Sequence, residues 1–163
     1  MLGEKLHAHA DDPLAWDELE AIDAVYFTGG DVGALHQARR ARILVATARE
    51  LPTLAEAGVE LDALVRSGQD SGERYRPGDI DPAPRLVATT EGADGGSYST
   101  VGGEKGRWKA APLPGPMQDM YGAGDCFAAG LAYALADGQA VARALDFAAG
   151  RAALAMTRPG GFP

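Results

Sequence analysis

Four short runs of apolar, strand-favouring residues recur along the chain, and segments with helical signals separate them. The runs are AVYFT (24–28), RILVAT (42–47), DALVRS (62–67) and RLVATT (85–90). They are apolar rather than alternating, which is typical of strands buried on both faces of a parallel sheet. Helices between such strands cover the two faces. The sequence therefore predicts an α/β fold, a mostly parallel sheet flanked by helices.

Turn signals divide the rest of the chain. Asp12 before Pro13 predicts the start of a short helix, Asp31 predicts the N-cap of a second helix ending near Ala41, and Gly58 predicts the end of a third. The segment 68–84 is polar and reads mainly as loop. The C-terminal part is expected to contain a hairpin of 97–101 with 106–112, followed by helices over 125–137 and 140–156.

Length and charge limit the classes of function. With 163 residues, we expect one α/β domain over 1–163. A net charge of -8 argues against a general affinity for nucleic acid or an anionic membrane. No run approaches the roughly 20 apolar residues of a membrane span, and Cys126 is the only cysteine. We therefore expect a protein of the reducing cytoplasm.

The segment Gly122-Ala123-Gly124-Asp125 directly precedes a strong helical pattern. The first N–H groups of a helix lack partners within the helix, and glycines let a ligand approach them closely, so the segment suits an anion. A carboxylate beside a bound phosphate chain can take the proton of an attacking hydroxyl. The spacing alone is equally consistent with a plain tight turn in which Asp125 is a helix cap.

Other nucleotide and metal motifs are missing. A dinucleotide-binding Gly-x-Gly-x-x-Gly motif would require glycine where the chain has Phe127, and the Gly-Lys pair of a P-loop does not occur. Three histidines and one cysteine provide no pattern of zinc ligands. We do not count Arg49, near a strand terminus, among the site residues.

The segment DMYGAGDCFAAGLAYAL (119–135) closely resembles the C-terminal signature of the PfkB-type, ribokinase-like carbohydrate kinases. RLVATTEGADGGSYS (85–99) is similar to that family's Thr-x-Gly-x-x-Gly phosphate turn, and 147–163 is similar to its closing helix and loop. The resemblance extends over about residues 20–163. It implies a ribokinase-like fold and ATP-dependent, magnesium-assisted phosphoryl transfer to a hydroxyl of a sugar or related small molecule.

The resemblance also implies roles for individual residues. Asp125 would be the general base, and the amides of Gly122, Ala123 and Gly124 would form the anion hole. The turn along the ATP phosphates would contain Thr90, Gly92 and Gly95. The helix bordering the adenine would contribute Ala149 and Ala153. A monovalent cation, potassium in some members, would be held by Asp119 and the backbone carbonyls of Tyr121, Met156, Pro159 and Gly161.

Two departures from the family pattern concern this site. Met120 stands where the signature usually has threonine. The family's Asn-x-x-Glu magnesium motif cannot occur because the chain has no asparagine, and residues 67–70 (Ser-Gly-Gln-Asp) occupy its place. Asp70 is therefore interpreted either as a residue that organises magnesium through water or as a simple loop residue.

The largest departure is length, since members of this family usually have about twice as many residues. Their N-terminal half supplies the sugar site and a small β lid, so we expect this chain to be the C-terminal, ATP-binding half, as a fragment or as a truncated member. A bare sheet edge would then favour association with a missing N-terminal segment or with another copy. Two alternatives stay open: a non-catalytic nucleotide-binding or interaction module, and a kinase of the same class acting on a nucleoside or vitamin precursor.

Overall fold

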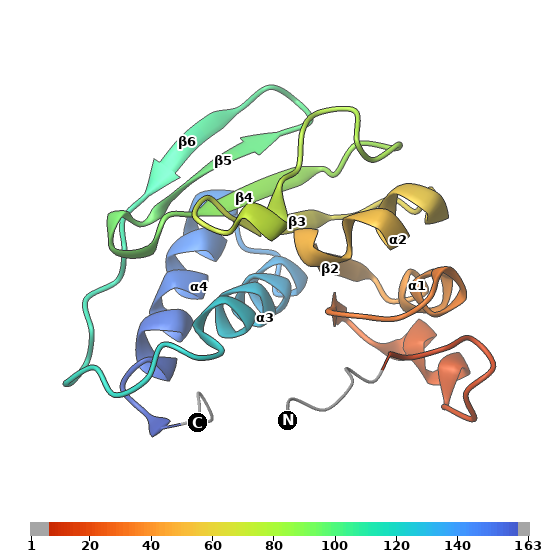
Figure 1. Cartoon of the computed structure of the whole chain (residues 1–163), viewed down its shortest axis with the longest axis horizontal. Helices are drawn as coiled ribbons and strands as arrows, with labels where there is room; N and C mark the ends of the chain where they lie inside the picture. Colours follow the sequence, from red (N-terminus) through yellow and green to blue (C-terminus); the bar gives the residue numbers. More distant parts are fainter. Residues whose placement is uncertain (1–6, 160–163) are drawn as a thin grey trace.

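The computed structural model describes residues 7–159 and shows a six-stranded sheet between two layers of helices (Figure 1). The strands lie side by side in chain order, and the first four are parallel whereas the last two form an antiparallel hairpin. Their bounds are β1 Ala24–Phe27, β2 Ile43–Thr47, β3 Ala63–Ser67, β4 Leu86–Thr90, β5 Gly96–Thr100 and β6 Lys105–Trp108. The predicted α/β class is confirmed.

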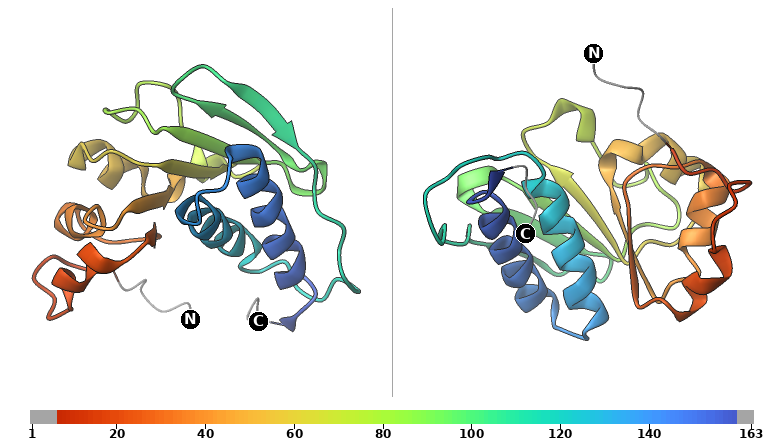
Figure 2. Two further views of the ribbon diagram at one scale, coloured as in Figure 1. Left: turned by 180° about the vertical axis from the view of Figure 1, so that it is seen from behind. Right: turned by 90° about the horizontal axis from the view of Figure 1, so that it is seen from below.

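Two pairs of helices cover the two faces of the sheet (Figure 2). One face carries α1 (Val32–Ala38) and α2 (Leu51–Ala57), and the other carries α3 (Ala123–Ala136) and α4 (Val141–Ala155). Four short 3₁₀ segments complete the elements: η1 Trp16–Ala21, η2 Ala48–Glu50, η3 Ser71–Glu73 and η4 Gly92–Asp94. Within residues 7–159, no helix has the length and hydropathy to cross a membrane.

The alternation of side chains along β2 explains the two layers. Leu44 and Ala46 are fully buried against α1 and α2, whereas Val45 between them is fully buried against α3 and α4. Successive side chains of a strand point to opposite faces, so an apolar residue at every position requires cover on both sides. The uninterrupted apolar runs therefore produce one hydrophobic core on each face of the sheet.

Most predicted helix boundaries are confirmed, and one is wrong. The Asp31 carboxylate accepts a hydrogen bond from the Ala34 N–H at 2.6 Å, which holds the pKa of Asp31 below its usual value. Gly58 ends α2 in the left-handed conformation, with φ of 60°. Asp12 does not begin the first helix, because its carboxylate instead accepts from the His9 N–H at 2.7 Å and the 3₁₀ segment starts at Trp16.

The two edges of the sheet differ in chemistry. Strand β6 carries Lys105 and Arg107, and charged side chains are a common protection of an exposed edge. Strand β1 at the other edge is Ala-Val-Tyr-Phe, without a charge, and pairs only with β2. An apolar parallel edge of this kind is unusual in a sheet that faces solvent. The fold thus leaves one protected and one unprotected edge.

Candidate active site

The N-terminus of α3 meets the carboxyl ends of the parallel strands. Gly122 is the N-cap and has φ of 78°, a left-handed conformation that glycine adopts without strain. Ala123, Gly124 and Asp125 form the first turn, whose N–H groups have no intrahelical acceptor. A Cβ atom placed on Gly124 would meet nothing within 4 Å. The Ala123 N–H donates to the Met120 carbonyl at 3.3 Å, and no described residue accepts from the N–H groups of Gly124 and Asp125. The helix therefore presents two open donors at the edge where open α/β sheets bind ligands.

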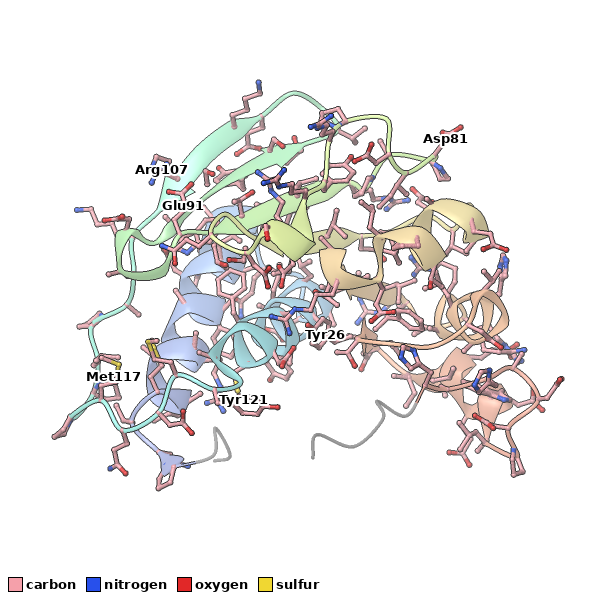
Figure 3. All side chains as sticks on the ribbon, viewed as in Figure 1. Tyr26, Asp81, Glu91, Arg107, Met117 and Tyr121 are labelled. Carbon is pink, nitrogen blue, oxygen red and sulfur yellow. The ribbon has the colours of Figure 1, made fainter. Side chains whose placement is uncertain are left out.

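The loop before this turn is fixed to the C-terminal end of α4. The N–H groups of Gln118 and Asp119 both donate to the carbonyl of Met156, at 2.9 and 3.2 Å. The Asp119 carboxylate in turn accepts from the Tyr121 N–H at 2.9 Å. Tyr121 itself is 81% exposed and points away from the helices (Figure 3). The contacts to Met156 hold the turn that is predicted to bind an anion.

The structure brings together part of the predicted cation site. Asp119 lies against Met156, but the Met156 carbonyl already accepts two hydrogen bonds, which is the full capacity of its oxygen. Pro159 is exposed at the end of the described residues, and Gly161 lies outside them. Cation binding by these residues stays a prediction.

Among residues 7–159, the Asp125 side chain has one hydrogen bond, which joins α3 to the edge strand β1. The Tyr26 hydroxyl, on β1, donates to Oδ1 of Asp125 at 2.9 Å, and Figure 3 shows Tyr26 beside α3. Burial raises the pKa of the Tyr26 phenol above its ordinary value, and the Asp125 carboxylate raises it further. Tyr26 is therefore a protonated donor at physiological pH and holds the exposed Asp125 carboxylate from one side.

Arg49 lies two residues after the end of β2 and contacts two carboxylates. Its Nε donates to Glu73 at 2.7 Å, and its Nη2 lies 3.7 Å from Asp70. Partial burial works to lower the pKa of Arg49, but the bond to Glu73 and the charges of Glu73, Asp125 and Asp70 outweigh burial and raise it. The Glu73 carboxylate is buried and also accepts from the Ser67 N–H. A guanidinium thus stays near Asp125, anchored by a buried acid.

The Thr90–Gly95 turn, predicted to lie along the ATP phosphates, follows β4 at the same edge of the sheet. Gly92 and Gly95 have φ of 61° and 82°. A Cβ on Gly95 would lie 2.2 Å from the Trp108 carbonyl oxygen, so only glycine fits there. Glu91 accepts from Ser97 and from Arg107, and Figure 3 shows Glu91 and Arg107 side by side. Contacts with β5 and β6 therefore fix the turn.

A family model described as pfkB family carbohydrate kinase matches residues 43–162. The chain belongs to this family. No curated protein sequence matches the chain. The matched residues include the Thr90–Gly95 turn, the first turn of α3 and the loop after α4.

Solved structures of ribokinase-like proteins share the fold of this pfkB family chain. Ribokinase from Thermotoga maritima has a TM-score of 0.72 and 18% identity, over 93% of this chain and 57% of its own. Adenosine kinase from Sinorhizobium meliloti has a TM-score of 0.73 and 20% identity, and the match covers 98% of this chain and 55% of the adenosine kinase. Arabidopsis thaliana ribokinase, solved with ribose and ATP, has a TM-score of 0.57 and 19% identity, over 80% and 55%. The chain spans a little over half the length of these proteins.

Two residues predicted to border an adenine in this pfkB family chain are buried. Ala149 is 7% exposed and packs in the core between α3, α4 and the sheet, and Ala153 is 2% exposed. Their small side chains permit close packing of α4, and their contact with a nucleotide stays a prediction. Gly150 beside them is open, because a Cβ there would meet nothing within 4 Å.

Sequence reasoning missed Tyr26 and Glu73. Tyr26 was one apolar residue of a strand, and its only signal was a hydroxyl near the carboxyl end of that strand. Glu73 sits in a polar loop where a solvated acid is the ordinary expectation, yet the structure buries it. The partner of each residue is distant in the sequence. Tyr26 and Asp125 are 99 residues apart, and Glu73 and Arg49 are 24 residues apart. Local pattern alone does not reveal such pairs.

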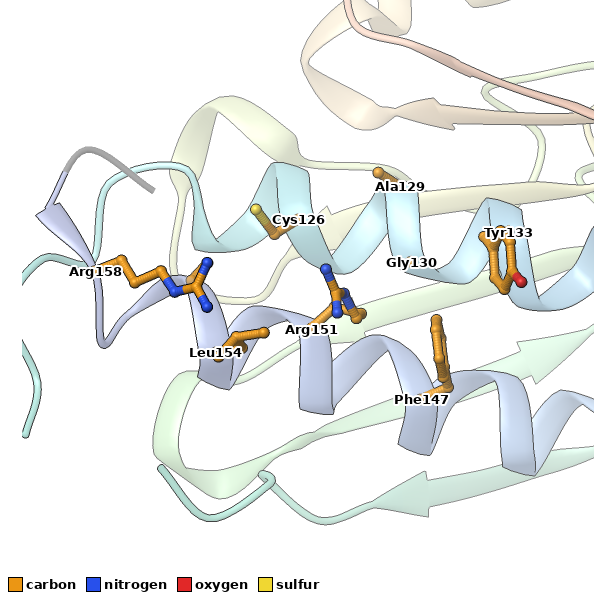
Figure 4. A pocket seen from close by; sticks show the side chains of 9 residues that line it. Cys126, Ala129, Gly130, Tyr133, Phe147, Arg151, Leu154 and Arg158 are labelled. Atoms are coloured by element: carbon orange, nitrogen blue, oxygen red, sulfur yellow. The ribbon is translucent and has the colours of Figure 1, made fainter. Parts of the chain in front are cut away.

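A groove of about 510 Å³ lies between the outer surfaces of α3 and α4 (Figure 4). Cys126 lies at one end of this outer groove, and Tyr133 stacks on Phe147 with ring centroids 5.6 Å apart. Tyr133 also lines a second groove between α3 and β1, which we call the edge groove. The remaining lining residues of the edge groove are Asp23, Ala24, Tyr26, Ala129, Ala132, Ala136 and Asp137.

Proposed function

We propose that the chain is the ATP-binding half of a kinase that transfers the γ-phosphoryl group of ATP to a hydroxyl of a sugar or related small molecule. The observation that carries the proposal is Asp125 in the first turn of α3, beside open backbone N–H groups at the carboxyl edge of the sheet. Membership in a carbohydrate kinase family supports the same reaction class.

In this mechanism each group at the N-terminus of α3 has a separate task. Asp125 accepts the proton of the acceptor hydroxyl, whose oxygen then attacks the γ-phosphorus. The N–H groups of Gly122 and Gly124 stabilise the charge that develops on the transferred phosphoryl group. The Ala123 N–H, the third predicted donor, donates to the Met120 carbonyl at 3.3 Å and would have to exchange that acceptor for a phosphoryl oxygen. The positive end of the helix dipole and the fixed donors require little reorganisation during transfer.

Further parts of the ATP site are proposed from the family pattern. The Thr90–Gly95 turn would lie along the phosphates, and Ala149 and Ala153 would border the adenine. The Arabidopsis ribokinase was solved with ATP and shares its fold with most of this chain, which supports ATP as the nucleotide. Asp119, Tyr121, Met156, Pro159 and Gly161 would hold a monovalent cation such as potassium.

Magnesium is implied by the family, but the chain itself offers no complete set of ligands. No group of three histidine, cysteine or acidic side chains arranged for a metal occurs in the described part, residues 7–159. Asp70, predicted to act through water, accepts from the Gly72 N–H at 2.8 Å and faces Arg49. Its role toward magnesium stays a prediction, and we assign no step to the metal.

Two alternatives have specific support. A nucleotide-binding or interaction module without turnover is one alternative, because Met120 and Asp70 stand where the family pattern has other residues. The fold shared with an adenosine kinase favours a nucleoside as acceptor. Acceptor contacts decide between a sugar and a nucleoside, and those contacts are expected mainly outside this chain.

Titration with Mg-ATP is the direct test of the proposal. We expect saturable binding by calorimetry and a rise in the free energy of unfolding of about 2.7 kcal/mol at 100 times Kd. ADP formation is then measured with panels of sugars and nucleosides. ADP formation that depends on the acceptor supports the kinase, and binding without turnover favours the module. A chain that binds neither ATP nor ADP contradicts both.

We also propose that a further polypeptide covers the β1 edge, either the missing N-terminal segment or another copy. The edge strand is apolar and unprotected, and Ile22 just before it is 42% exposed. The edge groove continues this surface onto α3, where Tyr133 is 61% exposed. Adding a strand parallel to β1 would satisfy its backbone groups and fill the groove. We further propose a cytoplasmic location, because a single cysteine in 163 residues is typical of proteins of a reducing compartment.

Light scattering tests association through this surface. The purified chain is expected to associate as its concentration rises, and Tyr133→Glu is expected to weaken that association by placing a charge in the edge groove. Val101→Glu is the matched control, because Val101 is 69% exposed on the β5–β6 turn, away from β1. A wild-type chain that stays monomeric at high concentration contradicts self-association, and equal effects of the two variants contradict the assigned surface.

A further inference from the structure

The hydrogen bond between Tyr26 and Asp125 joins two parts of the chain that no motif connects. Tyr26 is the third residue of β1, and Asp125 lies in the first turn of α3. The phenolic oxygen donates to Oδ1 of the carboxylate at 2.9 Å. Asp125 is exposed, so without this bond its side chain would be free to rotate about two torsions. The contact is therefore a restraint on the orientation of the candidate base.

The surroundings of Tyr26 make it a rigid donor. Its ring is half-buried and packs against the core formed by α3, α4 and the sheet. A ring fixed by packing moves little, so the direction of its O–H group is set by the fold rather than by solvent. Burial raises the pKa of the phenol, and so does the adjacent carboxylate, whereas Thr47 and Arg49 oppose the shift. Tyr26 therefore keeps its proton and cannot replace Asp125 as base.

The bond leaves the two carboxylate oxygens of Asp125 unequal. Oδ1 accepts from Tyr26, and no second side-chain hydrogen bond to Asp125 occurs among residues 7–159. Arg49 supplies positive charge nearby and is itself held by Glu73 at 2.7 Å. The carboxylate is thus held by a neutral donor, Tyr26, and the positive charge of Arg49 acts on it without a direct contact. Oδ2 is the oxygen that remains for a ligand.

We propose that Tyr26 is a positioning residue that fixes the Asp125 carboxylate so that Oδ2 faces the acceptor hydroxyl; this inference rests on the proposed kinase function. The acceptor proton passes to Oδ2, the acceptor oxygen forms its bond to the γ-phosphorus, and the bond from phosphorus to the β,γ-bridging oxygen breaks. The electron pair of that bond leaves with ADP. Tyr26 retains its proton throughout and contacts only Asp125.

Tyr26→Phe removes the donor and keeps the ring in its packed position. Misplacement of a catalytic group by about 1 Å can cost about 100-fold in rate. We expect kcat to fall about 10- to 100-fold, with the KM for the acceptor and the Kd for Mg-ATP unchanged. If kcat fell only because the substitution disturbed the fold, the Kd for Mg-ATP would also change and the melting temperature would fall. Tyr98→Phe is the matched control, because Tyr98 donates to Glu104 at 2.8 Å on the hairpin, far along the sheet from β1.

A second measurement does not depend on turnover. In carbon-13 NMR of the aspartate carboxyl groups, the Asp125 resonance is identified by its absence in Asp125→Asn. We expect this resonance to shift in Tyr26→Phe and to stay in place in Tyr98→Phe. An unchanged Asp125 resonance overturns the inference, and so does an unchanged kcat in an active chain. If the wild type neither binds nor turns over ATP, the proposed function fails, whereas the carboxyl resonance still decides the role of Tyr26.

Discussion

Replacing Asp125 with asparagine is expected to lower turnover by about 10²- to 10⁴-fold, the usual contribution of a positioned general base. The amide oxygen can still accept the hydrogen bond from Tyr26, so the local geometry is retained, but an amide cannot take the acceptor proton. Mg-ATP affinity should be kept or slightly raised, because the variant removes a negative charge beside the bound phosphates. ADP formation and calorimetric titration of the same preparations measure the two effects separately.

Asp146→Asn is the matched control for this prediction. Asp146 is exposed in the middle of α4, and its substitution makes the same change of charge away from the first turn of α3. The control should match the wild type in turnover and in binding. Turnover and binding of the two variants are compared in this chain, and also in its complex with any polypeptide found to cover β1. Turnover that survives in Asp125→Asn would refute the assignment of the base.

The elements of the fold were largely predictable because each has a local cause. The four parallel strands follow from uninterrupted apolar runs, and their burial on two faces follows from the alternation that β2 shows at Leu44 and Val45. Asp31 and Gly58 set helix boundaries through their own backbone and side-chain chemistry. Asp12 failed as a helix start because a competing contact, the His9 N–H, is equally local.

The candidate site was only partly predictable. Glycines before a strong helical pattern indicate a candidate anion site, so the segment from Gly122 to Asp125 could be selected from the sequence, although its spacing alone was equally consistent with a plain tight turn. The surroundings of Asp125 could not be predicted, because the Tyr26 hydroxyl and the charge of Arg49 come near it only after β1 and β2 pair in parallel. A parallel sheet gathers the ends of strands that are distant in sequence, and no local pattern records which side chains then meet. The sequence therefore indicated the chemistry of Asp125 itself, whereas its hydrogen-bond partner could be identified only from the folded structure.

Gly124→Leu is expected to abolish the stabilisation by Mg-ATP while leaving the unliganded chain at least as stable as the wild type. A Cβ at Gly124 meets nothing within 4 Å, so a side chain can be added there without displacing an atom next to its Cβ. Leucine is favoured over glycine within a helix by roughly 1 kcal/mol, which should slightly raise the free energy of unfolding. The same side chain occupies the space in front of the first-turn N–H groups, where the phosphates are proposed to lie.

Gly150→Leu separates occlusion of this site from a general effect on helices. Gly150 is exposed within α4, and a Cβ there also meets nothing within 4 Å. Both variants should therefore gain helix stability, but only Gly150→Leu should keep the rise of about 2.7 kcal/mol that Mg-ATP produces at 100 times Kd. Thermal unfolding with and without Mg-ATP gives both quantities. If Gly124→Leu still responds to Mg-ATP as the wild type does, the nucleotide binds away from α3, and the N-terminal turn of α3 is a structural cap rather than an anion site.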